Sequence, residues 1–293
     1  MHQLQLFEFA RPKRIVNVSS VPKRSPFRYP GGKTWLIPEI RQWLSSKIVQ
    51  PKLLLEPFAG GGIVGLTAAF ERLASHVNLI ELDPDVASVW KAILSEDGYW
   101  LAQRILDFEL TTENADVALN SVPINNREKA FKTILRNRIS HGGILAPGGG
   151  RLKSGENGRG ITSRWYPQTL AYRIRAINEI RDRISFSEQD GIQTIRDHKD
   201  NADAVFFIDP PYTAAGKRAG RRLYTYCELD HEDLFDVCRN IKGDFLMTYD
   251  NADDVRQMAI ARGFDVELIS MKNTHHAEMS ELLIGRDLSW LRM

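Results

Sequence analysis

Seven short apolar runs recur along the chain, and stretches with the apolar spacing of amphipathic helices separate most of them. The runs lie at residues 53–58, 77–82, 183–189, 204–209, 244–250, 265–270 and 281–286. Strands that alternate with helices indicate βαβ units and a mostly parallel sheet. About ten residues without a helical pattern join the last two runs, which favours an antiparallel hairpin. The pattern therefore predicts an α/β fold with a seven-stranded, mostly parallel sheet and an antiparallel final hairpin.

One interval interrupts this alternation. Between residues 111 and 179 no strong strand pattern occurs, and the middle of the interval, HGGILAPGGGRLKSGENGRG, is rich in Gly, Arg and Lys. Such a composition predicts a loop between flanking helices. We therefore expect one α/β domain over residues 25–110 and 180–293, an inserted and mainly helical domain over 111–179, and a polar arm over 1–24.

Composition and charge narrow the class of protein. The 293 residues are 43% hydrophobic and 26% charged, as in ordinary globular proteins. No apolar run reaches the ~18–20 residues that span a bilayer, and the first residues lack the pattern of a secretory signal. The two cysteines, Cys227 and Cys238, have no metal-type spacing and suit thiols in a reducing compartment. These features predict a cytoplasmic protein without a membrane segment and without a bound metal.

The net charge of +2 is unevenly distributed. Residues 127–183 hold thirteen Lys and Arg against four Asp and Glu, a local net charge of +9, so the remainder carries −7. A basic segment on an acidic body fits a surface that faces a polyanion. The aromatic residues Trp165 and Tyr166 within this segment favour nucleic acid.

The stretch VFFIDPPYTAAG at residues 205–216 ends a strand abruptly. Two consecutive prolines lack N–H groups and fix their φ angles, and a residue before proline avoids the helical region. The turn is therefore stiff, and it presents Asp209, the Pro210 carbonyl and the Tyr212 ring at the carboxyl end of the sheet. Ligands of open α/β sheets bind at that end.

A second group of residues predicts a nucleoside site. In LLLEPFAGGGIVGLTAAF a glycine loop with Gly60 and Gly62 joins a strand to a helix, which allows a ligand to approach the backbone closely. The next strand ends at Glu81, whose carboxylate can accept hydrogen bonds from both hydroxyls of a ribose. Neither G-x-G-x-x-G nor a P-loop is present, so a nucleoside without pyrophosphate fits best, and S-adenosyl-L-methionine is the favoured candidate. In FRYPGGK, Tyr29 and Lys33 can meet the same ligand, with Lys33 facing its carboxylate.

These motifs together resemble a known family, the Dam-like, D12-class adenine-specific DNA N6-methyltransferases with the alpha-type motif order. The matching elements are FRYPGGK, EPFAGGG, IELDPD, NR at 137–138, RW at 164–165, DPPY and SELLI, in the order of the family, over residues 25 to about 286. The resemblance implies a Rossmann-like, S-adenosylmethionine-dependent methyltransferase fold with an inserted target-recognition domain. It also implies that Tyr29, Lys33, Glu81 and Asp209 touch the methyl donor. The recognition segment differs from that of GATC-specific members, so no target sequence follows from the resemblance.

The candidate site residues fall into three groups. The catalytic candidates are Asp209, Pro210, Pro211 and Tyr212, and the cofactor-binding candidates are Tyr29, Lys33, Phe58, Gly60, Gly62, Glu81, Asp83, Asp190 and Asp209. The DNA-binding candidates are Arg138, Arg151, Arg164, Arg221, Arg222 and Tyr226. Double-stranded DNA is the expected partner. We further expect the protein to be prokaryotic or phage-encoded and to be a monomer or a weak dimer. A cognate restriction endonuclease that acts separately is a further expected partner.

The DPPY turn suggests how methyl transfer could work. The N6 amine of adenine is a poor nucleophile because its lone pair is delocalised, and acceptors for both of its N–H groups would pull the nitrogen toward tetrahedral geometry. Asp209 and the Pro210 carbonyl are those acceptors, and Tyr212 offers a face for an extruded base. Cytosine C5 chemistry needs a cysteine that usually follows a proline, and neither cysteine does. Cytosine-N4 methylation of DNA, adenine-N6 methylation of RNA, glutamine methylation of protein and a catalytically dead DNA-binding module remain as alternatives.

Overall fold

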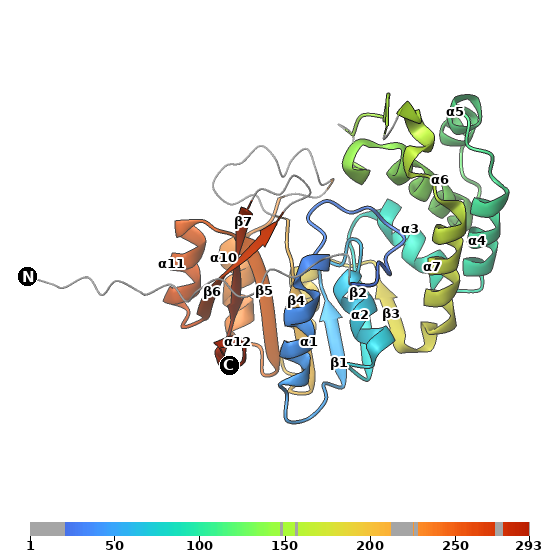
Figure 1. Ribbon diagram of the computed structural model, residues 1–293. Coiled ribbons are helices and arrows are strands. Elements are labelled where there is room, and N and C mark those ends of the chain that lie inside the picture. Colours follow the sequence, from blue (N-terminus) through green and yellow to red (C-terminus); the bar gives the residue numbers. More distant parts are fainter. Residues whose placement is uncertain are drawn as a thin grey trace, which may run out of the picture.

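The fold is built on one mixed sheet of seven strands. The computed structural model describes residues 21–146, 149–155, 158–211, 225, 228–272 and 278–292. The strands are β1 (Leu53–Glu56), β2 (His76–Ile80), β3 (Ile184–Ser187), β4 (Ala204–Ile208), β5 (Asp244–Asp250), β6 (Asp265–Lys272) and β7 (Glu278–Gly285). Their order in the sheet is β3-β2-β1-β4-β5-β7-β6 (Figure 1). The pairs from β3 to β5 are parallel, whereas β7 is antiparallel to both β5 and β6. The predicted fold class, with its antiparallel final hairpin, is confirmed.

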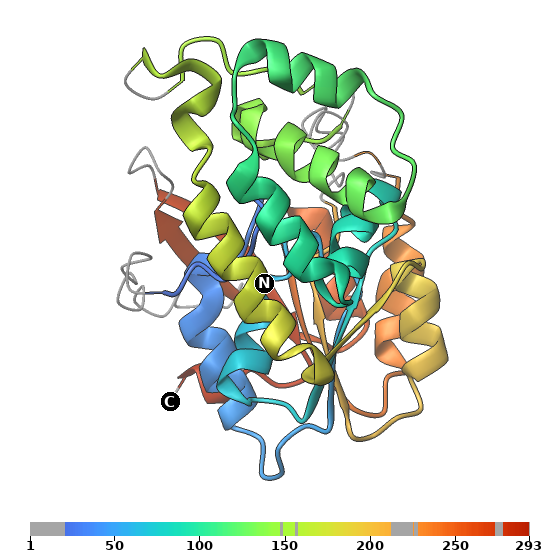
Figure 2. The same ribbon diagram turned by 90° about the vertical axis from the view of Figure 1, so that its right-hand side faces the viewer.

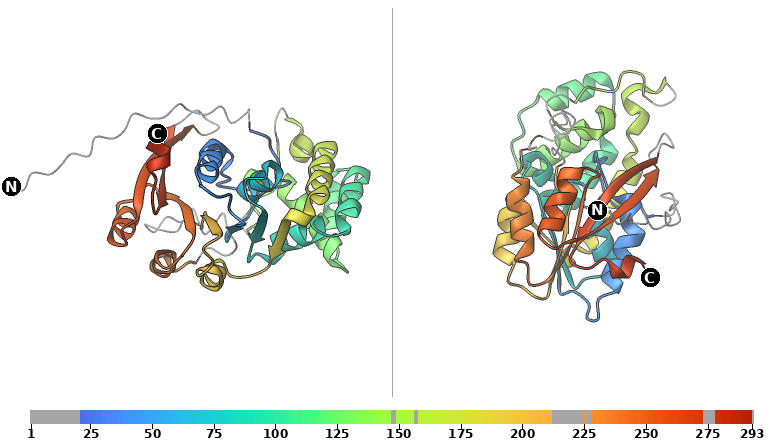
Figure 3. Two further views of the ribbon diagram at one scale, coloured as in Figure 1. Left: turned by 90° about the horizontal axis from the view of Figure 1, so that it is seen from below. Right: turned by 90° about the vertical axis from the view of Figure 1, so that its left-hand side faces the viewer.

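Helices cover both faces of the sheet. One face carries α1 (Ile37–Ser45), α2 (Ile63–Glu71) and α3 (Pro84–Ile93), and the other carries α8 (Gly191–His198), α10 (His231–Arg239) and α11 (Asp253–Ala261) (Figure 3). In β4, Val205 and Phe207 belong to the first core, and Phe206 and Ile208 to the second. Because successive side chains of a strand point to opposite faces, a strand buried on both sides is apolar throughout. That explains the uninterrupted apolar run before Asp209.

A group of helices lies beside the β3 edge of the sheet (Figures 1 and 2). It comprises α4 (Asp97–Asp107), α5 (Thr112–Asn120), α6 (Asn126–Ile139) and α7 (Pro167–Glu179). Helix α6 packs against α3, and α4 packs against α7, so the group continues into the core of the first face. Between 111 and 179 the described residues form no strand, only an isolated bridge of Ser140 with Arg151. The interval is helical as predicted; its status as a separate domain stays a prediction.

Short helices complete the chain. They are η2 (Thr34–Leu36), η3 (His141–Gly143), η5 (Gly160–Arg164), η6 (Arg181–Arg183) and α12 (Ser289–Arg292). Over the described ranges, no helix is long and apolar enough to cross a membrane. Most of the predicted arm, residues 1–20, lies outside the described residues.

Candidate functional site

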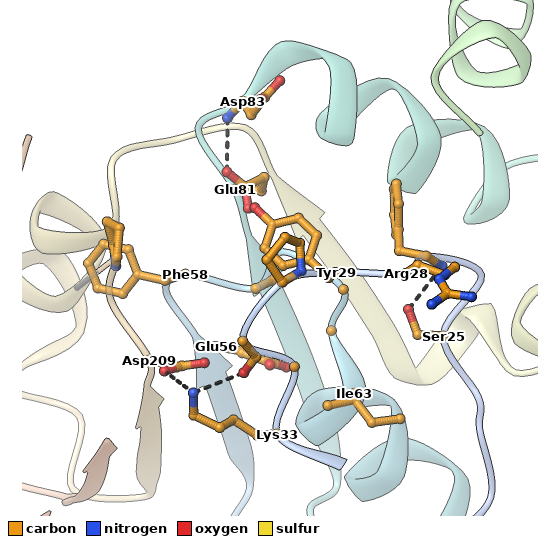
Figure 4. A pocket seen from close by; sticks show the side chains of 18 of the residues that line it. Ser25, Arg28, Tyr29, Lys33, Glu56, Phe58, Ile63, Glu81, Asp83 and Asp209 are labelled. Atoms are coloured by element: carbon orange, nitrogen blue, oxygen red, sulfur yellow. Dashed lines mark hydrogen bonds and ion pairs between the residues drawn. The ribbon is translucent and has the colours of Figure 1, made fainter. Parts of the chain in front are cut away.

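A cavity of about 570 Å³ opens at the carboxyl ends of β1, β2 and β4. Its size lies within the range of small-molecule sites, about 300–1,000 Å³. Of the predicted site residues, Tyr29, Lys33, Phe58, Gly62, Glu81, Asp83, Asp190, Asp209, Pro211 and Arg138 line it. Figure 4 shows several of these side chains around Tyr29. The chain therefore gathers most of the predicted cofactor-binding residues, together with Asp209, around one cavity.

The glycine loop is shaped by two close approaches. Gly60 has a φ of +47°, and a Cβ there would lie 2.5 Å from Cε1 of Tyr29. Gly62 has a φ of +61°, and a Cβ there would lie 2.9 Å from Cζ2 of Trp90. The indole N–H of Trp90 donates to the Gly60 carbonyl at 3.0 Å and holds the loop against α3. Both positions need glycine for its backbone freedom and for the lack of a side chain.

Glu81 follows β2 and is held in place by the backbone. Its Oε2 accepts the Gly60 N–H at 2.9 Å, and its Oε1 accepts the N–H groups of Leu82 and Asp83, both at 2.9 Å. Burial raises the pKa of Glu81 to about 6, although these N–H groups oppose the shift. Because a carboxylate oxygen has two lone pairs, Oε2 keeps acceptor capacity beside the cavity. That arrangement suits the hydroxyl of a ribose.

Asp209 follows β4 and meets a buried ammonium. Its Oδ1 accepts the Thr248 hydroxyl at 2.8 Å and pairs with Nζ of Lys33 at 2.9 Å. Lys33, 2% exposed, also lies 3.4 Å from Oε2 of Glu281 and donates to the Gly31 carbonyl at 2.9 Å. Burial alone would lower the pKa of Lys33, but Asp209 and Glu281 outweigh it and raise that pKa. The three hydrogens of this ammonium thus face three protein acceptors, and its predicted contact with a ligand carboxylate stays a prediction.

Two carboxylates of this region were missed by the sequence analysis. Glu56 ends β1, and its Oε2 accepts the Gly65 N–H at 2.7 Å. Burial raises the pKa of Glu56 to about 8, opposed by that N–H and assisted by the charge of Asp209. Glu281 lies in β7, where burial raises its pKa to about 7 despite the attraction of Lys33. An acidic residue at the end of an apolar run, as in LLLEPF, was the available signal for Glu56.

Of the other cofactor-binding candidates, Asp83 and Asp190 lie at the beginnings of helices, and Phe58 packs next to Gly191. Oδ1 of Asp83 accepts the Asp85 N–H at 2.8 Å and caps α3, and Oδ1 of Asp190 accepts the Gln193 N–H at 2.8 Å and caps α8. Asp190 is exposed and still lines the cavity. Behind it, Gly191 leaves room for the Phe58 ring, since a Cβ there would lie 2.7 Å from Cε1 of Phe58.

The candidate DNA-binding residues have different surroundings. Arg138 is 5% exposed and donates to the Pro26 carbonyl. Arg151 pairs with Oδ1 of Asp116 at 2.7 Å, and Arg164 is partly exposed at the end of η5. The predictions for Tyr212, Arg221, Arg222 and Tyr226 fall outside the described residues. DNA contact by any of these residues stays a prediction.

Comparison with known proteins supports the family resemblance. The model of a family described as D12 class N6 adenine-specific DNA methyltransferase matches residues 29–139, which include the glycine loop, Glu81 and the NR pair. The resemblance to this methyltransferase family is confirmed over that part of the chain. No curated protein matches the chain significantly.

Two solved structures are similar at low identity. One is described as a candidate RNA methyltransferase from Pyrococcus horikoshii, at 11% identity and a TM-score of 0.41, covering 92% of each chain. The other is a methyltransferase from Geobacter sulfurreducens, at 12% identity and a TM-score of 0.39, covering 88% of this chain and 80% of that one.

Proposed function

We propose that this protein transfers a methyl group from S-adenosyl-L-methionine to the N6 amine of adenine in duplex DNA, after extruding the target base. The observation that carries the proposal is the fixed carboxylate of Asp209, which lines the same cavity as the glycine loop and Glu81. The match of residues 29–139 to the D12 family supports the choice of adenine in DNA. The proposal includes action in the cytoplasm, where both the donor and DNA are available.

The residues that line the cavity fit S-adenosyl-L-methionine. Glu81 would accept the ribose hydroxyls, and Tyr29 and Phe58 offer aromatic faces. The donor supplies a methyl group on a positively charged sulfonium. The carboxylates of Glu81 and Asp209 give the cavity an electrostatic environment that suits such a cation.

Asp209 would act by orienting the amine. Thr248 and Lys33 hold its Oδ1 from the side of the sheet, so the carboxylate does not have to be ordered when the base arrives. One N–H of the amine would bond to this carboxylate and the other to the Pro210 carbonyl, which directs the nitrogen lone pair toward the methyl group. Transfer would form the N–C bond as the S–C bond breaks, with the sulfur leaving as a neutral thioether and the amine releasing one proton to solvent. Tyr212 would stack on the extruded base.

Single-turnover methylation with Asp209→Asn tests this function. The substrate is unmethylated genomic DNA, the donor is saturating, and the methylated nucleosides are identified by mass spectrometry. We expect N6-methyladenine from the wild type and a rate lower by about a hundred- to thousandfold in the variant, because one preorganised group is lost. Asp203→Asn, at an exposed position just before β4 and in a pair with Lys52, is the matched control and should leave the rate unchanged.

Three results would contradict the proposal. A rate near that of the wild type in Asp209→Asn would exclude the role of this carboxylate in orienting the amine. Detection of N4-methylcytosine would support methyl transfer but would identify cytosine, not adenine, as the target base. Transfer to RNA and not to DNA would change the nucleic acid.

A further inference from the structure

Three arginines line the cavity on the side formed by residues 25–28, α6 and α7. Arg28 precedes Tyr29, Arg138 lies in the last turn of α6, and Arg173 lies in α7. In Figure 4, Arg28 and Ser25 lie on one side of Tyr29, and Lys33 and Asp209 lie on the other. Burial lowers the pKa of Arg138 to about 9, and the like charges of Arg173 and Arg28 contribute. The guanidinium groups of Arg28 and Arg173 are therefore each close enough to repel that of Arg138.

The described residues supply little compensation for the charges of Arg138 and Arg173. Across the described residues, neither Arg138 nor Arg173 forms an ion pair, and their acceptors are backbone carbonyls, Pro26 for Arg138 and Ser25 for Arg173 at 3.0 Å. The side chain of Arg138 is 5% exposed, and its Nε is buried without a hydrogen-bond partner. Buried charges in proteins are normally paired, because an unpaired charge loses its hydration free energy and gains no compensating interaction. An unpaired buried guanidinium at a cavity wall therefore indicates that a bound anion completes the site.

The rest of the cavity has the opposite polarity. The carboxylates of Glu81 and Asp209 line it, and the buried ammonium of Lys33 already faces Asp209, Glu281 and Gly31. A ligand that fills the whole cavity should thus carry an anion at one end and hydroxyl or cationic groups along the remainder. S-adenosyl-L-methionine has this distribution, with an α-carboxylate on its amino-acid moiety, a sulfonium, and a ribose diol.

We propose that Arg28, Arg138 and Arg173 form an oxyanion site and that its ligand is the α-carboxylate of the amino-acid moiety of the methyl donor. This inference rests on the proposed function and assigns the carboxylate to the arginines in place of Lys33. A guanidinium can hold a carboxylate through two parallel hydrogen bonds, which an ammonium cannot. A phosphate of the DNA backbone is the competing anion. The burial of Arg138 favours the small ligand, because the cavity holds Glu81 as well and one donor molecule can satisfy both.

Calorimetric titration with two donors that differ only in the carboxylate tests the inference. We expect the wild type to bind S-adenosyl-L-methionine about tenfold or more tightly than its decarboxylated form, the effect of one charge-assisted contact. In Arg173→Met this preference should disappear through weaker binding of the carboxylated donor alone, and Arg173→Lys should lie between the two. Arg175→Met, which removes a partly exposed arginine of the same helix that does not line the cavity, is the matched control and should keep the preference.

Each contrary outcome has a distinct meaning. Equal binding of the two donors by the wild type would overturn the carboxylate assignment, and this comparison needs no variant to fold. Unchanged donor preference with weaker DNA binding in Arg173→Met would also overturn it and assign the site to a phosphate. Failure of the wild type to bind S-adenosyl-L-methionine, its decarboxylated form or 5′-methylthioadenosine, which lacks the amino-acid moiety, would instead contradict the proposed function. Circular dichroism of each variant establishes that it is folded.

Discussion

Asn137 and Arg28 lie 109 positions apart and exchange two hydrogen bonds: the Arg28 N–H donates to Oδ1 of Asn137 at 2.9 Å, and Nδ2 of Asn137 donates to the Arg28 carbonyl at 2.9 Å. The same Nδ2 donates to the Gly143 carbonyl at 2.6 Å. Asn137 is fully buried. The NR pair at 137–138 thus attaches α6 to the segment that leads into Tyr29, since Arg138 bonds to Pro26 next to it.

Replacing Asn137 with Ala should destabilise the fold. The substitution removes the acceptor of the Arg28 N–H and the donor to the Arg28 and Gly143 carbonyls, which we expect to cost about 2–3 kcal/mol of unfolding free energy. Urea unfolding measures the difference. Asn120→Ala, at the exposed end of α5, is the control and should stay within about 0.5 kcal/mol of the wild type. A similar stability for both variants would show that the two-way bond does not hold α6 to this segment.

Replacing Glu81 with Ala should weaken donor binding. The variant loses the carboxylate beside the cavity and leaves three backbone N–H groups without their acceptor, so we expect a loss of about 2–3 kcal/mol in binding free energy. Glu81→Gln keeps an acceptor oxygen and should lose less. Calorimetry with S-adenosyl-L-methionine gives both values, and Glu113→Ala, on the exposed first turn of α5, serves as the control. An unchanged affinity in Glu81→Ala would show that the ribose binds elsewhere in the molecule.

Residues that end strands were the most predictable part of the site. Asp209 and Glu81 follow apolar runs, and a run that stops at a proline or a polar turn defines its own carboxyl end, as β4 (Ala204–Ile208) does before Asp209. The final hairpin was predicted too short: its strands extend over Asp265–Lys272 and Glu278–Gly285. Backbone pairing between antiparallel strands continues there beyond the apolar positions that the sequence reveals.

Contacts between distant side chains were not predictable. Glu281 reaches Lys33 only because β7 lies two strands from β4 in the sheet. No local sequence pattern predicts this strand order. The pair at 137–138 was interpreted in part as a DNA contact because Arg138 is basic and lies in a basic segment. Its burial against Pro26 depends on how α6 packs, which composition and spacing do not specify.

The raised pKa of Glu56 predicts lower stability in mild alkali. Its pKa is about 8 in the folded protein against 4.5 for an ordinary glutamate, so between these values the folded state binds more protons than the unfolded state. Stability should therefore fall as pH rises through this window, by at most about 1.4 kcal/mol per pH unit for one group. The raised pKa values of Glu81 and Glu281 act in the same direction.

Glu56→Gln isolates the contribution of this group. The amide oxygen can still accept the Gly65 N–H, and no charge forms at high pH, so the variant should match the wild type near pH 5 and exceed it near pH 8. Urea unfolding across this range gives the two slopes. Parallel slopes for wild type and variant would mean that Glu56 ionises at its ordinary pKa.

The basic segment should make DNA binding strongly dependent on salt. Each phosphate that a cation neutralises releases counterions, so the logarithm of the affinity falls with the logarithm of the salt concentration by about 0.9 per contact. Lys153 and Arg159 are exposed, and Arg164 is partly exposed, in the part of this segment between α6 and α7. Replacing all three with Gln should weaken binding to every DNA sequence and reduce the slope by up to about 3. Fluorescence anisotropy over a salt series measures both quantities. Lys52→Gln, which removes an exposed lysine at the amino end of β1, should leave them unchanged. A flat salt response of the wild type would exclude a phosphate-binding surface here and favour a protein or small-molecule substrate.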